Sequence, residues 1–166
     1  MTTRNETKAR AAIKTVLDAV TDIGATHDYE RFADDWETLI LRYRTTIGSV
    51  DQLRGWNISL SAVEQEQETF GAPGAVGTVE ISYDYRIRGY MAVDDASGSE
   101  KIFATLTMAL IADLDAAATL HSSNTQDGAN GNFWGPPVPS ARFDFRVFSE
   151  VLVHYVELQQ VLKETV

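Results

Sequence analysis

The chain has 166 residues, of which 44% are hydrophobic and 10% aromatic, and its formal net charge is -10. This composition is typical of one folded domain with a buried core, and it argues against a disordered chain. Cysteine is absent, which excludes disulfides, thiolate metal sites and cysteine nucleophiles. General binding to duplex DNA needs clustered lysine and arginine, so the negative charge argues against it. We expect no membrane span and no secretory signal, because no sufficiently long apolar run is present.

The first third of the chain predicts two helices. Apolar residues recur at three- and four-residue spacing between residues 5 and 23, which is typical of one apolar helical stripe. Thr3 and Glu6 have capping-box spacing, and Gly24 is placed to end this helix. A second helix is predicted after a turn at residues 26–28. Its shared apolar face consists of Phe32, Trp36, Leu39, Ile40 and Tyr43.

The middle of the chain changes to the period of a strand. Residues 56–60 and 78–88 both alternate apolar and polar side chains, and a glycine-rich turn separates them. This pattern predicts a β-hairpin. The same alternation places Glu64 and Glu66 on the apolar face of the first strand, so that face changes from apolar to acidic along its length. We therefore expect a hairpin near 64–78 whose tip projects as an acidic arm.

The second half of the chain predicts a third helix, a long loop and two more strands. Ser97 and Glu100 have capping-box spacing and begin the helix, which has more apolar surface than one contact with a sheet can cover. Residues 121–141 lack periodicity and contain three of the four prolines. Loops of this length are usually functional or disordered. The chain closes with strand patterns at 143–147 and about 151–163.

These elements follow the order α-α-β-β-α-β-β. They predict a single domain over residues 1–166. The expected fold class is α+β, an antiparallel sheet of about four strands with helices packed on one face.

The sequence offers few groups for chemistry. Asp94 and Asp95 could hold a metal, but their place before a helix favours a role in the turn and with the helix dipole. We interpret Glu64, Glu66 and Glu68 as one solvated strand face. The three histidines match no metal motif, and no phosphate-binding, dinucleotide-binding or nucleophile-elbow motif occurs. We predict no catalytic residue, no cofactor and no metal site; an enzyme assembled from residues distant in the sequence stays open as an alternative.

Four segments together resemble the tail terminator, or tail-completion, proteins of long-tailed phages and related tail-like particles. The segments are 24–36 (GATHDYERFADDW), 54–59 (RGWNIS), 85–103 (YRIRGYMAVDDASGSEKIF) and 149–158 (SEVLVHYVEL). They extend through most of the chain in the order that this family shows. The loop at 121–141 and the acidic hairpin tip have no counterpart in the resemblance.

The resemblance implies a virion protein at the head-proximal end of the tail, assembled in the host cytoplasm. Such proteins form a homo-oligomeric ring, here expected to be a hexamer, that ends polymerisation of the tail tube. The implied partners are other copies of the chain, the major tail-tube protein and the head-completion or connector protein. DNA is implied only as passing cargo, and no membrane is involved. The alternatives are a head-completion or neck protein, a tail-tube subunit or, from another class, a small enzyme or ligand-binding domain.

Two groups of residues are candidates for contacts in such a particle. Glu64, Glu66 and Glu68 on the hairpin would repel phosphates and keep a DNA passage from adhering. Phe133 and Trp134 lie between glycines and prolines in the long loop. They either anchor a neighbouring subunit, as aromatic residues often do, or fold back on their own subunit as a lid.

Overall fold

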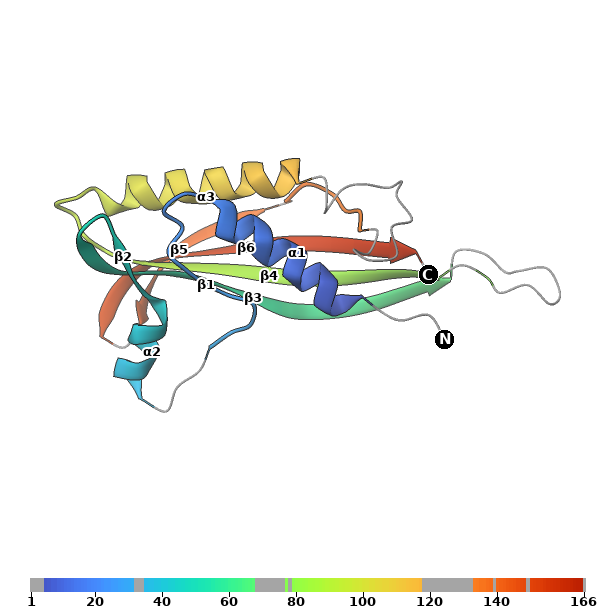
Figure 1. The fold of residues 1–166 in the computed structure, drawn as a ribbon, viewed down its shortest axis with the longest axis horizontal. Coiled ribbons are helices and arrows are strands. Elements are labelled where there is room, and N and C mark those ends of the chain that lie inside the picture. The colour runs from blue at the N-terminus through green and yellow to red at the C-terminus, as the bar shows by residue number, and fades with distance from the viewer. Residues whose placement is uncertain are drawn as a thin grey trace.

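A long sheet forms the centre of the molecule. The computed structural model describes residues 5–31, 35–67, 77, 79–117, 133–138, 140–148 and 150–165. The strand order is β1-β3-β4-β6-β5, and β2 pairs with β3 (Figure 1). The strands are β1 (Ala25–His27), β2 (Arg44–Ile47), β3 (Val50–Gln67), β4 (Val79–Ala92), β5 (Ala141–Phe148) and β6 (Val151–Thr165). The helices are α1 (Glu6–Ala19), α2 (Trp36–Tyr43) and α3 (Ser99–Ala116).

Helices pack on both faces of this sheet. α1 and α3 cover one face (Figure 1). The main core between these helices and the sheet contains Trp56, Tyr85 and Ile87. α2 packs on the other face near one end, where Tyr43 belongs to a second, smaller core with Tyr90. The rest of that second face carries no helix among the described residues.

The structure corrects the predicted fold class. The sheet has six strands rather than about four, and it is mixed because β1 pairs in parallel with β3. The helices lie on two faces rather than one. The missed strands β1 and β2 have three and four residues, too few for alternation to be recognised in the sequence. β1 forms where a turn was expected, because Gly24, at φ +97°, lets the chain approach β3; a Cβ there would lie 2.4 Å from the Arg54 carbonyl oxygen.

The start of α3 also differs from the predicted cap. The N-cap of α3 is Gly98, not the predicted Ser97, and the first residue of the helix is Ser99. The Ser99 hydroxyl accepts a hydrogen bond from the Asp94 amide at 2.8 Å and lies 2.8 Å from His154 Nε2, which fixes this helix to β6.

The start of α1 is capped from the far end of the chain. Glu164 in β6 is 2% exposed, and its carboxylate accepts hydrogen bonds from the amide of Asn5 at 3.1 Å and from its side chain at 2.9 Å. The Tyr83 hydroxyl donates to the same carboxylate. A negative charge at a helix N-terminus is favourable, so β6 stabilises the position of α1. The predicted cap, Thr3, lies outside the described residues.

Candidate functional site

A β-bulge in β3 decides which side chains lie on the open face of the sheet, that is, the face away from α1 and α3. On one side of the bulge Leu60 pairs with Tyr85, and on the other Ala62 pairs with Asp84, so Ser61 is an extra residue. Side chains alternate between faces with a period of two residues. One extra residue therefore turns every following side chain of β3 to the opposite face.

The bulge corrects the predicted position of the acidic residues. Glu64 stands opposite Ser82 and Glu66 opposite Glu80, all on the face away from α1 and α3. The alternation had placed Glu64 and Glu66 on the apolar face of the strand. The helix-covered face therefore does not become acidic along β3, because Glu64 and Glu66 lie on the opposite face.

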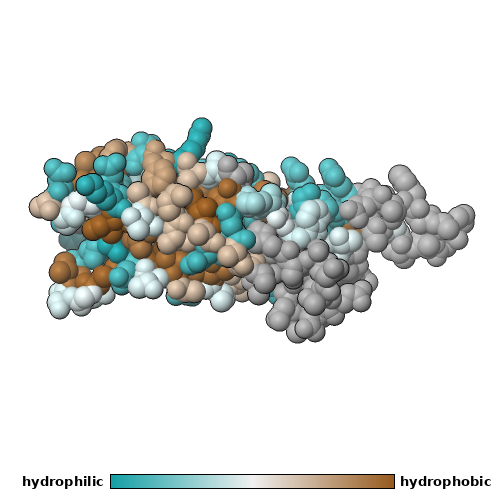
Figure 2. Space-filling view, turned by 90° about the horizontal axis from the view of Figure 1, so that it is seen from above, coloured by the Kyte–Doolittle hydropathy of each residue, from teal (hydrophilic) through white to brown (hydrophobic). Residues whose placement is uncertain are grey.

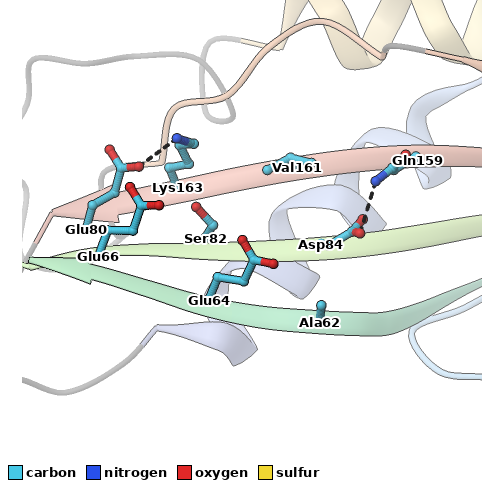
Figure 3. Close-up of a pocket in the computed structure, with 9 residues that line it drawn as sticks. All are labelled: Ala62, Glu64, Glu66, Glu80, Ser82, Asp84, Gln159, Val161 and Lys163. Atoms are coloured by element: carbon cyan, nitrogen blue, oxygen red, sulfur yellow. Dashed lines mark hydrogen bonds and ion pairs between the residues drawn. The ribbon is translucent and has the colours of Figure 1, made fainter.

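These residues line a hollow of about 310 Å³ on the open face, towards the hairpin end of the sheet (Figure 3). Its wall comes from β3, β4 and β6. The lining residues are Ala62, Glu64, Glu66, Glu80, Ser82, Asp84, Gln159, Val161 and Lys163. Four of these are carboxylates and one is a lysine, so the hollow is negatively charged.

One ion pair holds the end of the hollow together. Lys163 Nζ lies 2.6 Å from Glu80 Oε1, and Glu80 is only 7% exposed (Figure 3). Lys163 Nζ also lies 4.9 Å from the centre of the Trp134 ring. A buried carboxylate is costly unless a positive charge compensates it, so Lys163 is what allows Glu80 to lie between the strands.

Asp84 lies at the other end of the hollow. Its Oδ2 accepts a hydrogen bond from Gln159 Nε2 at 3.0 Å (Figure 3). It also accepts one from Ser61 Oγ at 3.4 Å. Its Oδ1 is buried and has no hydrogen-bond partner among the described residues. Glu64 and Glu66 are exposed. The hollow therefore combines two anchored carboxylates with two that face solvent.

The arginines further along the same face are neutralised by acidic residues. Glu157 accepts from Arg88 Nε at 3.0 Å and lies 3.2 Å from Arg86, while Arg88 also pairs with Glu30 at 2.8 Å. Burial raises the pKa of Glu157, but hydrogen bonds from Arg88 and Tyr155 together with the arginine charges lower it further, so the net pKa lies below its usual value. These arginines do not form a free basic patch.

The structure places the candidate contact residues in different surroundings. Phe133 is 1% exposed and belongs to the main core of its own chain, so it has no surface to offer a neighbour. Trp134 is half-buried, and its backbone pairs with Lys163 of β6. Gly135 makes this approach possible, because a Cβ there would lie 2.1 Å from the Val161 carbonyl oxygen. Glu68 lies outside the described residues.

Sequence reasoning missed an exposed apolar surface at the edge of the sheet. Its residues, which we call the apolar margin, are Phe143, Phe145, Val147 and Leu152, with exposed fractions of 52%, 57%, 72% and 48%. Alternation in β5 predicted a strand with one apolar side. It could not indicate that this side is left largely uncovered.

The described part of the chain contains no group of three or more His, Cys, Asp or Glu residues that could hold a metal ion. No described helix is long and apolar enough to cross a membrane. No protein-family model matches the chain, and no curated protein shows significant similarity to it.

Proposed function

We propose that the protein is a structural subunit of a long-tailed virus or a related particle, and that it caps the tail tube as a homo-oligomeric ring. The observation that carries this proposal is the acidic hollow near the hairpin end of the open face. There, Glu64 and Glu66 face solvent beside the anchored carboxylates of Glu80 and Asp84 (Figure 3). A surface past which DNA must move has to repel phosphates, and clustered carboxylates do so.

In the proposed ring, the hairpin end of each subunit faces the central passage. The ring is a hexamer, in keeping with the resemblance to tail terminators. One side of it meets the last tail-tube subunits and stops their polymerisation, and the other side meets the head-completion or connector protein. DNA is passing cargo, and the subunit performs no catalysis.

Ring closure needs two different surfaces on each subunit, because a head-to-tail contact joins one patch to another. α3 supplies a candidate for one of them. Its Met108 is 59% exposed and its Ile102 is 37% exposed, although α3 packs against the main core with its buried side. Exposed apolar side chains on a helix are a common feature of protein contacts.

Particle imaging tests the location. The full chain carrying a small tag would be labelled in assembled particles and imaged by electron microscopy. The expected result is label at one position, where the tail meets the head. Label distributed along the tail would instead show a tube subunit, and label inside the head would show a neck or head-completion protein; either result overturns the proposal.

A charge reversal tests the role of the hollow. In the double variant Glu64→Lys/Glu66→Lys the solvent-facing carboxylates become ammonium groups, so the purified protein should retain DNA at low salt, whereas the native protein should not. The matched control is Asp95→Lys/Asp113→Lys, which changes the charge equally at exposed positions outside the hollow. Equal DNA retention by both variants would show that the hollow has no special place in DNA passage.

A further inference from the structure

Among the described residues, β5 is an edge strand that is long and straight. It ends the sheet on one side, and residues 142–147 are all exposed. Its register with β6 is continuous from Ala141 to Phe148, without a bulge, and the strand contains no proline. Edge strands in soluble proteins are normally shortened, bent, covered or charged, because their free amides and carbonyls pair with other strands, and of these devices β5 shows only the charges. One amide of this strand is satisfied locally, since Phe145 N donates to Asp144 Oδ1 at 2.8 Å.

One side of β5 carries most of the apolar margin. Phe143, Phe145 and Val147 alternate along the strand and point to the same side of the sheet as α3. α3 contacts this side at Phe143, where the Phe103 ring meets the Phe143 ring edge-on, with ring centres 6.4 Å apart. Figure 2 looks onto this side of the molecule and shows hydrophobic surface between the hydrophilic residues. Patches of this kind mark contacts.

The other side of β5 is charged, with Asp144 between Arg142 and Arg146. Arg146 is held on this side by Tyr155, with its Cζ 3.6 Å from the ring centre. An antiparallel copy of β5 centred on Phe145 would place Asp144 opposite Arg146 of the second copy, twice. Opposite charges at directly paired positions stabilise a sheet.

The same register is also favourable on the apolar side. It places Phe145 opposite Phe145 of the second copy, and Phe143 opposite Val147, twice. A register centred on Asp144 would instead set that carboxylate against itself and Arg142 against Arg146, which is unfavourable. A register centred on Phe143 would leave residues 146–148 unpaired.

We propose that β5 pairs antiparallel with β5 of a second copy of this chain, centred on Phe145, and that the free protein is this dimer. The contact joins two identical surfaces, so it closes after two copies and cannot propagate. It extends the sheet across the dimer and brings Phe143, Phe145 and Val147 of the two chains together. The proposal concerns the free chain and does not rest on the proposed ring.

Charge reversal at the paired positions tests this register. In Asp144→Arg, each of the two 144–146 pairs of the dimer consists of two arginines. In Arg146→Asp, each of these pairs consists of two aspartates. Sedimentation equilibrium of the full chain should give a dimer for the native protein, and dimerisation weakened by about tenfold or more for either variant. An equimolar mixture of the two variants should restore dimers, since each arginine then meets an aspartate. Asp113→Arg, at an exposed position of α3, should dimerise like the native chain.

A second variant keeps the test informative if Arg146→Asp folds poorly after losing its contact with Tyr155. The exchange Asp144→Arg/Arg146→Asp in one chain again pairs opposite charges, so it should dimerise although Asp144→Arg alone does not. The proposal is overturned if the native chain is a monomer up to its solubility limit, or if neither the mixture nor the exchange restores what Asp144→Arg loses. Particle imaging that finds no ring would refute the proposed function and leave this result standing.

Discussion

The two faces of β3, β4 and β6 are built from neighbouring residues of the same strands and yet differ in what stabilises them. On the face under α1 and α3, Trp56, Tyr85 and Ile87 are fully buried. On the other face, beyond α2, the same strands carry the acidic hollow and the arginine cluster around Glu157. One face of the sheet therefore stabilises the fold, and the other is exposed for contacts. Neighbouring residues of each strand belong to opposite faces.

Different forces act on these faces. Burial of large apolar side chains contributes about 1.5–3 kcal/mol each, whereas a solvent-exposed ion pair contributes about 0–1 kcal/mol. Substitutions under the helices should therefore cost most, and those on the open face should cost little unless they leave a buried charge uncompensated. The following predictions test this difference.

Trp56→Ala should have the largest effect. The Trp56 ring fills the space above Gly89, where a Cβ would lie 2.6 Å from it, and stacks on Phe103 with ring centres 5.9 Å apart. Its Nε1 donates to the Ile23 carbonyl at 3.1 Å. Removing the ring leaves a cavity and an unsatisfied carbonyl, so the free energy of unfolding should fall by about 4 kcal/mol. Urea denaturation measures it, and Leu41→Ala, at a side chain 61% exposed, should change it by under about 0.5 kcal/mol.

Lys163→Met tests whether the open face contains an essential charge pair. The variant leaves Glu80, which is 7% exposed, without the ammonium 2.6 Å away. Because the Lys163 side chain is 29% exposed and water can partly screen the site, we expect a loss of about 2 kcal/mol rather than the full cost of a buried charge. Adding Glu80→Gln should recover most of this loss in urea denaturation. A double variant as unstable as the single one would show that the pair is not what stabilises this end.

Much of this architecture could be predicted from long patterns in the sequence. α1 and α3 were predicted because their apolar stripes extend over several turns, and the strands of the β3–β4 hairpin because their alternation is long. β1 and β2 were missed because three or four residues carry no readable period. The cap of α1 by Glu164 joins the two ends of the chain, and no local rule indicates such a contact.

The candidate site was less accessible to sequence reasoning. Glu64 and Glu66 were recognised as an acidic group but placed on the wrong face, because Ser61 continues a polar series and nothing marks it as an extra residue. The charged residues that line the hollow beside them, Lys163 and Asp84, come from β6 and β4, and only the sheet register brings them together. The exposure of Phe145 depends on β5 being an edge strand, which the order of strands in the sequence does not reveal.

His154 should give a smaller, pH-dependent effect at the edge of the covered face. It is 5% exposed, and its ring lies between those of Phe103 and Phe145, with ring centres 5.8 Å and 5.1 Å away. Burial lowers the pKa of His154 more than the charge of Glu100 raises it. As pH falls through about 6.5, His154 is therefore protonated in the unfolded chain before it is protonated in the folded one. Its contribution to the stability of the fold is complete above this pH and is lost below it. His154→Gln should reduce the fall in melting temperature between about pH 7 and pH 5; an unchanged pH profile would contradict the assignment.

Deleting Ser61 should have the smallest effect and gives the sharpest test of how the two faces are assigned. The deletion removes the extra residue and restores regular pairing, with Leu60 still opposite Tyr85 and the next residue, Ala62, still opposite Asp84. Every side chain keeps its face, and the deletion removes only the hydrogen bond from Ser61 Oγ, 3.4 Å from Asp84 Oδ2. We expect the free energy of unfolding to change by less than about 1 kcal/mol.

Deletion of Ser82 is the matched control, since this serine lies in a regular part of β4 that pairs on both sides. Its removal forces Glu80 and Ile81 to exchange faces, so it brings a carboxylate under the helices and an apolar side chain into the hollow. The cost should be about 3 kcal/mol or more, from a buried charge and a lost core residue. Amide hydrogen exchange along the hairpin would distinguish the two deletions, with protection of β4 retained in the first and lost in the second. If the Ser61 deletion destabilises the protein as much as the Ser82 deletion, Ser61 is needed for the fold itself. The bulge would then have a structural role besides placing Glu64 and Glu66 on the open face.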